Sequence, residues 1–317
     1  MKDTLTLPYF TQAERSIDYL GQYKYLDIDG LDLDSPVGER LLLSEGIFVR
    51  GPKLAQLENL VVDGHKTVVL EPHPDDLALS ASGRLMTSIA AGGVGKIINI
   101  FSKTAIDRFP WRDKITIAED KFEELRLLES NLAVEEFLGQ EFVSMKLPLA
   151  SKRGYEEIFG QTHHDDALAR EIGEFIANTS LEFGADTILS PLAVQGHIDH
   201  LVTFDAAIFA KRALGDQVSL VFYEDYPYSR NKNAYRRRIG QVAGSYALSS
   251  EYVAVDDYLN IMADMAIIYR SQFDDINRDQ MLAIMREDFR AVALEAKAED
   301  KDVGAECAQR YWRMNES

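Results

Sequence analysis

The stretch KTVVLEPHPDDLALSASG, residues 66–83, joins a short apolar run to a polar segment and then to a run of small residues. The apolar run has the β-branched composition of a buried strand, and the residues after it have that of a helix. In open α/β sheets, ligands bind beyond the carboxyl ends of the strands. The stretch therefore predicts one strand-to-helix unit of such a sheet, with His73 to Asp76 at the ligand-binding edge.

The same alternation of β-branched runs and amphipathic segments continues beyond this unit. Strands are predicted at 66–71, 95–102, 141–147, 186–192 and 219–224, with an edge strand at 251–257. Helices are predicted at 77–91, 114–138, 165–183 and 199–214, and residues 256–312 are predicted to be helical from their periodic Met, Ile, Leu and Phe. This order is typical of an α/β, Rossmann-like fold, with a mostly parallel sheet and helices on both faces.

The chain before residue 66 has a different character. Residues 1–65 are mixed, acidic and rich in turn-forming residues, without a clear repeat. We interpret them as an N-terminal extension that packs on the main domain, which spans residues 66–317. No low-complexity linker interrupts that domain.

Composition and charge restrict the class of protein. With 317 residues and 46% hydrophobic content, the chain can bury a sizeable core. The formal net charge of −18 disfavours nucleic acid and anionic membrane as partners, because binding phosphates needs basic patches. The one dense basic run, RRRIG at 236–240, is interpreted as a solvated helix face.

Membrane-spanning segments, signal peptides and cysteines also restrict the class of protein. The chain has no apolar run of 18 residues, and its start lacks the features of a signal peptide, so a cytoplasmic location and no membrane partner are expected. The single cysteine, Cys307, excludes an internal disulfide framework and a Cys-based zinc cluster. A metal site would therefore use His and carboxylate ligands.

A second polar cluster, PLAVQGHIDH at 191–200, follows another predicted strand. Its His197 and His200 are three residues apart at the start of a helix, where they share one face. Together with His73, Asp75 and Asp76, they provide histidines and carboxylates at two strand ends. Other Asp pairs, such as 165–166 and 256–257, are interpreted as helix caps or solvated faces.

Catalytic zinc takes about three protein ligands from His and Asp or Glu and leaves a position for water. His73, Asp76 and His200 would supply such a site. Asp75 could then accept a proton from the water, and His197 could donate to an oxyanion or a departing amine. The alternative is that these histidines only cap strand ends or lie at the surface, which requires two independent coincidences.

A third segment, VFYEDYPYSR at 221–230, ends the last of the predicted parallel strands with Tyr223, Glu224, Asp225, Tyr226 and Tyr228. These side chains could form a hydrogen-bonding wall for a polyhydroxylated substrate. Strand propensity alone would equally explain several of the tyrosines.

These residues resemble the LmbE-like or PIG-L zinc-dependent de-N-acetylases. The family's His-Pro-Asp-Asp and His-x-Asp-His motifs read here as PHPDDL and HIDH. Weaker similarities lie in RLLESNLAVEEFLG (126–139), in FYEDYP, and in YRSQF (269–273). The resemblance covers roughly residues 66–275 and implies the family's Rossmann-like fold.

The resemblance also implies roles for particular side chains. Zinc ligands fall on His73, Asp76 and His200, and the general base falls on Asp75. Zinc is therefore the expected cofactor, although other divalent transition metals suit the same ligands.

The oxyanion-stabilising histidine of the family falls on His197, with Asp199 as the acid that tunes it. One position departs from the family: the glutamate that follows the two aspartates is Leu77 here. A missing carboxylate beside the metal would weaken metal retention, so Leu77→Glu is expected to tighten it.

The expected function is that of a metal-dependent amide hydrolase, an N-deacetylase. It would remove an N-acyl group, acetyl in the first instance, from an amino sugar or related small amine. Metal-bound water would attack with Asp75 as general base. The alternative is a catalytically silent member that binds a sugar or a partner protein. A homo-oligomer is compatible with either function.

Overall fold

The structure, a computed structural model, describes residues 23–25, 42–43, 65–103, 119–160, 162–273, 276–301 and 303–315. Within the predicted N-terminal extension it describes two short strands, β1 (Tyr23–Tyr25) and β2 (Leu42–Leu43), which pair antiparallel. The rest of residues 1–64 lies outside the described residues. The boundary between extension and domain therefore stays a prediction.

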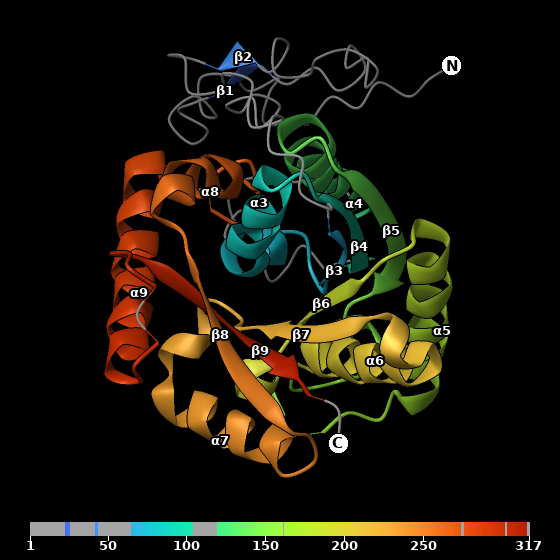
Figure 1. Cartoon of the computed structure of the whole chain (residues 1–317). Coiled ribbons are helices and arrows are strands. Elements are labelled where there is room, and N and C mark those ends of the chain that lie inside the picture. The colour runs from blue at the N-terminus through green and yellow to red at the C-terminus, as the bar shows by residue number, and fades with distance from the viewer. Residues whose placement is uncertain are drawn as a thin grey trace.

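A seven-stranded sheet, in the order β5-β4-β3-β6-β7-β9-β8, forms the centre of the molecule (Figure 1). Its strands are β3 (Lys66–Glu71), β4 (Val94–Lys103), β5 (Glu141–Pro148), β6 (Thr187–Pro191), β7 (Ser219–Tyr223), β8 (Leu248–Ala254) and β9 (Ala308–Met314). The first five of these strands pair in parallel, and β9 is antiparallel to both of its neighbours. The predicted mostly parallel sheet is confirmed.

Helices cover both faces of this sheet, as predicted (Figure 1). One face carries α3 (Ser82–Ala90), α4 (Glu119–Asn131), α8 (Leu259–Ala266) and α9 (Arg278–Ala298). The other carries α5 (Asp166–Phe183), α6 (Ile198–Leu214) and α7 (Lys232–Ala243). Alternate residues of β3 enter the two cores: Val69 joins the first cluster, and Val68 and Leu70 join the second. This period of two is the pattern of a strand buried on both sides.

The prediction of helices through residue 312 is wrong at its end. Helix α9 stops at Ala298, and Ala308–Met314 forms β9 between β7 and β8. Tyr311 and Trp312 favour a strand, and Tyr311 is fully buried against the sheet's first core. The periodic apolar residues that suggested a helix lie mostly in α8 and α9 and all precede β9.

Two other boundaries differ from the prediction. The predicted edge strand is confirmed as β8, but it begins three residues earlier, at Leu248. Helix α4 continues as a π-helical segment (Leu132–Phe137), and residues 104–118, where its predicted start falls, lie outside the described residues.

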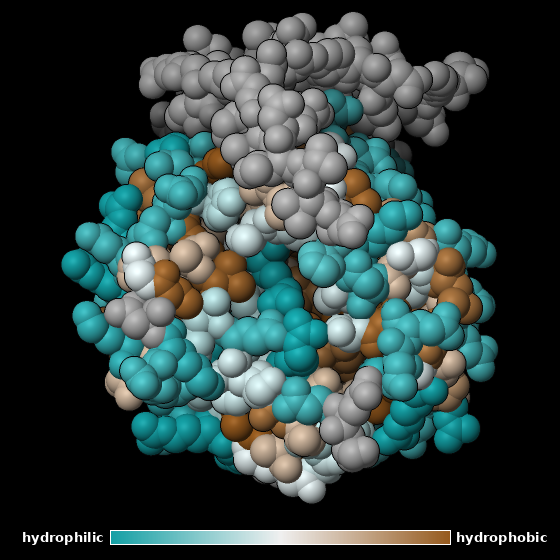
Figure 2. All heavy atoms as spheres, in the orientation of Figure 1, coloured by the Kyte–Doolittle hydropathy of each residue, from teal (hydrophilic) through white to brown (hydrophobic). Residues whose placement is uncertain are grey.

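In the part of the chain that the structure describes, none of the helices combines the length and the apolar character needed to cross a membrane. On the face shown in Figure 2, hydrophilic side chains predominate, and apolar ones form separate patches among them.

Candidate metal centre

The two polar motifs meet because their strands are neighbours. Strands β3 and β6 pair in parallel, so their carboxyl ends lie side by side. The segment His73 to Asp76 follows β3, and His197 is the N-cap of α6, which begins shortly after β6. The structure thus brings the six predicted site residues into one region at the edge of the sheet.

Three ligand atoms of the predicted metal set converge. His73 Nδ1 lies 3.6 Å from Asp76 Oδ2, and His200 Nε2 lies 3.4 Å from the same oxygen. The two ring nitrogens are 3.3 Å apart. In a tetrahedral zinc site with metal–ligand distances of about 2.1 Å, neighbouring ligand atoms lie about 3.4 Å apart. The triangle has the dimensions that such a site requires.

His197 belongs to the same cluster. Nitrogen atoms of His73, His197 and His200 all lie within 4.8 Å of one another, and the three histidines could hold a metal ion. The ring centroids of His73 and His197 are 4.7 Å apart. The Nδ1 of His197 accepts a hydrogen bond from the backbone N–H of Asp199 at 3.2 Å, which places the proton of the neutral ring on Nε2.

Carboxylates outside the triangle orient two of the imidazoles. Asp225 Oδ1 is 2.5 Å from His200 Nδ1, and Asp199 Oδ2 is 2.9 Å from His73 Nε2. A partner on the far ring nitrogen fixes the tautomer in which the other nitrogen can bind a metal. The sequence places Asp225 directly after a predicted parallel strand, in the third polar segment, but does not indicate its contact with His200.

The resemblance implied that the carboxylate of Asp199 contacts His197. In the structure this carboxylate lies against His73 instead. Its other oxygen, Oδ1, accepts from Arg153 Nη1 at 2.6 Å. Burial alone would raise the pKa of Asp199, but the hydrogen bond to His73 and the positive charge of Arg153 hold it well below its ordinary value. Asp199 is therefore a fixed negative charge beside the cluster.

Electrostatics at the cluster favour a cation. Burial lowers the pKa of His200, but the negative charges of Asp76 and Asp225 outweigh it and raise that pKa to about 9. By contrast, burial and the neighbouring His73 and His200 hold the pKa of His197 well below its ordinary value. The carboxylates thus favour positive charge at His200, and His197 is the neutral ring.

Asp75 has a strained backbone next to the triangle. Its φ of 117° is rare for a residue with a side chain, and such strain is often found at functional sites. Burial and the charge of Asp76 raise the pKa of Asp75 well above its ordinary value, and Arg126, at 3.8 Å, lowers it. A carboxylate with a raised pKa is suited to accept a proton near neutral pH.

The carboxyl group of Glu71, the last residue of β3, binds the backbone of the strained turn that carries Asp75. Glu71 is fully buried, and its Oε1 accepts from the backbone N–H groups of Asp75 and Leu77 at 3.2 and 3.4 Å. Asn99 Nδ2 donates to its other oxygen at 3.2 Å. Burial and Asp76 raise the pKa of Glu71 to about 8. In the sequence, Glu71 ends the apolar run of a predicted strand, and no local pattern indicates this contact with the turn.

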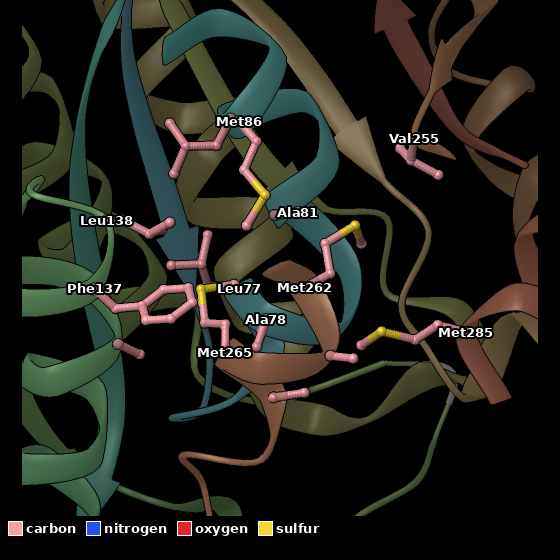
Figure 3. Packing of buried hydrophobic residues seen from close by; sticks show 14 of the residues in the cluster. Leu77, Ala78, Ala81, Met86, Phe137, Leu138, Val255, Met262, Met265 and Met285 are labelled. Carbon is pink, nitrogen blue, oxygen red and sulfur yellow. The ribbon is translucent and has the colours of Figure 1, made fainter. Parts of the chain in front are cut away.

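Leu77 does not lie open beside the metal ligands. Its side chain is 1% exposed and points into the core with Phe137 and Met265 (Figure 3). The expectation that Leu77→Glu tightens metal binding is therefore withdrawn, because a carboxylate there would enter an apolar cluster. In this chain the carboxyl group at the turn comes from Glu71.

We expect Leu77→Glu to destabilise the fold by about 3 kcal/mol or more, because it removes a buried leucine and buries an unpaired charge. Leu77→Met, which keeps an apolar side chain of similar volume, should cost less than about 1.5 kcal/mol. Urea denaturation of both variants measures the difference. A Leu77→Glu protein as stable as Leu77→Met would contradict this placement.

Two segments of the weaker resemblance also meet at the turn. Arg126 Nη2 donates to the carbonyl of Pro74 at 2.9 Å. One helical turn later, Glu129 accepts from Ser271 N at 2.8 Å and from Ser271 Oγ at 2.5 Å. Helix α4 therefore links the YRSQF segment to the loop that carries Asp75.

Glu129 should make stability depend on pH. Burial raises its pKa from the ordinary 4.5 to about 7. Between these values the native state holds a proton that the unfolded chain releases, so the contribution of Glu129 to stability falls as pH rises. Glu129→Gln cannot titrate, and its stability relative to the wild type should rise by about 2 to 3 kcal/mol across this window.

Urea denaturation at pH 4.5, 6 and 7.5 checks this expectation. The exposed Glu171 on α5 provides a matched control, Glu171→Gln, which should reproduce the wild-type profile. A constant difference between Glu129→Gln and the wild type at all three pH values would show that Glu129 does not titrate in this range.

The tyrosines of the third segment do not form one wall. Tyr223 is fully buried and donates to the Leu70 carbonyl at 2.9 Å, and Tyr226 packs edge-on against Phe289. Tyr228 alone of the three lies beside the histidines, with its ring centroid 5.9 Å from that of His200. Core packing explains the first two, and Tyr228 is left as a candidate for substrate contact.

Comparisons with known proteins agree with this arrangement. No protein-family model matches the chain. A curated relative, 2'-N-acetylparomamine deacetylase of Streptomyces fradiae, is 27% identical over 218 residues, which cover 66% of this chain and 74% of the relative.

Solved structures share the fold. A deacetylase of teicoplanin biosynthesis, in complex with bog, superposes with a TM-score of 0.61 at 20% identity, covering 80% of this chain and 98% of that one. GalB, the 4-carboxy-2-hydroxymuconate hydratase of Pseudomonas putida KT2440, superposes with a TM-score of 0.54 at 12% identity, covering 80% and 97%. The fold alone therefore does not select the reaction. With the two motifs joined at one centre and a curated deacetylase as a relative, the chain is similar to the LmbE-like deacetylases.

Proposed function

We propose that the protein is a zinc-dependent hydrolase that removes an N-acyl group, acetyl above all, from an amino sugar or a related small amine. The observation that carries this proposal is the triangle of His73 Nδ1, Asp76 Oδ2 and His200 Nε2, whose sides measure 3.3 to 3.6 Å. A general-base candidate, Asp75, and a neutral imidazole, His197, flank it.

The residues present fit a zinc ion. Two imidazole nitrogens and one carboxylate oxygen form a mixed ligand set that leaves a position open, which is typical of catalytic zinc. Asp225 and Asp199 hold the outer nitrogens of the two imidazoles, as outer partners of zinc-binding histidines commonly do. When bound, zinc supplies Lewis acidity and lowers the pKa of water towards neutrality.

Asp75 accepts the proton of the attacking water in this proposal. Its raised pKa lets the same carboxyl hold that proton and then return it to the departing nitrogen. Arg126 lies 3.8 Å from Asp75 and also binds the Pro74 carbonyl, and Glu71 holds the backbone N–H of Asp75. These contacts keep the strained Asp75 in place during the proton transfers.

His197 stabilises the negative charge that develops on the amide oxygen. Its Nδ1 is occupied by the backbone N–H of Asp199, so its Nε2–H is the group that can donate. Phe159 and Tyr228 pack against its ring, with centroids 5.2 and 6.5 Å away. The imidazole is thus a preorganised donor, which is worth more than one that must first reorient.

The substrate class rests on the relatives. A deacetylase of N-acetylparomamine and a deacetylase of teicoplanin biosynthesis are both similar to this chain. We infer from them a substrate with an N-acylated amine, and an amino sugar is the simplest molecule of that class.

Turnover of a panel of N-acetylated amino sugars, with release of free amine as the readout, tests the proposal. The zinc-loaded protein should release amine from at least one member of the panel. If a fully zinc-loaded protein binds these sugars but turns over none of them, the silent binding function becomes the better assignment.

A further inference from the structure

A pocket of about 200 Å³ lies next to Phe159, whose ring contacts His197 of the histidine cluster. We call it the arginine pocket, because Arg237 and Arg238 of α7 line it together with Gln195 and Gln241. Both arginines belong to the basic run at 236–240, which was interpreted from the sequence as a solvated helix face. Only part of that interpretation is right: Arg236 and Arg237 are exposed, but Arg238 is half-buried.

The pocket shares a wall with the catalytic centre. Gly160 N donates to Gly196 O at 2.8 Å, and Phe159 pairs with His197 in an isolated antiparallel bridge. The ring of Phe159 lines the pocket and also meets the ring of His197 edge-on, at 5.2 Å between centroids. The ring of Phe159 therefore contacts both the arginine pocket and the proposed oxyanion donor.

The loop that forms this wall is strained. Ala193 and Gln195 have φ values of 62° and 65°, which side-chain-bearing residues rarely adopt. Gly196, with φ of 74°, could not carry a side chain, because its Cβ would lie 1.9 Å from the carbonyl oxygen of Gly160. Strain of this kind often marks a ligand-binding loop, and here it accompanies Gln195 at the pocket.

One hydrogen-bond donor of a residue that lines the pocket lacks an acceptor among the described residues. Arg238 Nε donates to the Leu192 carbonyl at 2.7 Å, and its guanidinium stacks 4.3 Å from the ring of Phe204. These contacts fix the plane of the guanidinium, yet its Nη2 is buried and has no hydrogen-bond partner among the described residues. A buried donor without a partner costs stability unless a ligand supplies an acceptor.

We propose that the arginine pocket binds an anionic group, a carboxylate or a phosphate, of the N-acylated substrate. A planar guanidinium matches the oxygens of both groups, and the exposed Arg237 adds a second positive charge to the lining of the pocket. In a chain of net charge −18, such a cationic pocket beside the catalytic centre selects for substrates that carry this group. The assignment rests on the proposed function for the position of the acyl group.

Binding measurements test this without turnover. Inorganic phosphate is titrated calorimetrically into the zinc-loaded wild type, Arg237→Gln and Arg236→Gln. Arg237 is exposed, so its loss should leave the fold intact, and Arg236 is a matched control that carries the same charge on the same helix outside the pocket. Arg238→Gln is avoided because Arg238 also anchors the Leu192 carbonyl.

The expected result is that Arg237→Gln weakens phosphate binding about tenfold while Arg236→Gln changes it less than about twofold. Equal weakening in both variants would indicate a general charge effect, and phosphate that binds equally well to all three proteins would lie elsewhere, for instance on the zinc. Either result, or no saturable binding, overturns the proposal.

A second arm distinguishes a group of the substrate from a free anion. The Asp75→Asn protein, which should bind but not hydrolyse, is titrated with N-acetylglucosamine and with its 6-phosphate. The phosphorylated sugar should bind about tenfold more tightly, and adding Arg237→Gln should remove most of that advantage. Phosphate binding without such an advantage would make the pocket a free-anion site and contradict the proposal. Since neither arm requires hydrolysis, absence of turnover would contradict only the proposed function.

Discussion

The Asp75→Asn variant is expected to retain its metal and to lose at least about 10²-fold in kcat, the usual effect of removing a positioned base. Asparagine keeps the size of the side chain but cannot accept the proton. Asp75 lies outside the triangle of ligand atoms formed by His73, Asp76 and His200. Amine release and elemental analysis on the same preparation measure both parts.

A matched control is Asp166→Asn, at an exposed position in the first turn of α5, which should leave both metal content and kcat unchanged. If Asp75→Asn instead loses its metal, while Asp76→Asn keeps it and loses turnover, the roles of the two aspartates are reversed.

The His200→Ala variant is expected to lose its metal and, with it, activity. His200 is 1% exposed, and its two nitrogens contact Asp76 and Asp225, so alanine removes one side of the ligand triangle. Asp225→Asn removes only the outer partner of His200, so we expect it to lower metal affinity by about 10- to 100-fold. The loss of metal affinity in His200→Ala should be larger than this.

Titration with a competing chelator ranks these variants. His163→Ala serves as the control, because His163 pairs with Asp205 at 2.8 Å and is not part of the histidine cluster. A His200→Ala protein that still competes for zinc as strongly as His163→Ala would exclude His200 as a ligand.

Much of the fold follows from the sequence because a doubly wound sheet repeats one local rule. Each parallel strand is an apolar run that a helix follows, so β3, β4, β5, β6 and β7 are predicted to within one or two residues at each end. Strand β9 breaks this rule: it comes after two helices and inserts antiparallel between β7 and β8. Its place is fixed by long-range pairing, such as Phe222 with Trp312, which no local pattern reports.

The sequence predicts the inner residues of the candidate centre but not the residues that surround them. The two motifs identify the inner side chains, since polar residues that directly follow buried parallel strands lie at the ligand-binding edge of the sheet. The residues that bind the outer atoms of these side chains are brought to them by the tertiary fold, so no local pattern identifies them. Glu71 is a strand residue, and nothing in the sequence indicates that its carboxyl group binds the turn that carries Asp75. Likewise, the Asp199 carboxylate contacts His73, which is distant in the sequence, and not the nearby His197. In the sequence, Leu77 stands where the family has a glutamate, which suggests a lost carboxylate. In the structure, it is a buried core residue.

The most direct test of the central claim is to measure zinc content and amine release together, through removal and return of the metal. The purified protein should contain close to one zinc per chain, lose amine release when a chelator removes it, and recover when zinc is restored, with His200→Ala failing to recover. Full amine release from protein shown by elemental analysis to be free of transition metal would contradict a metal-dependent hydrolase.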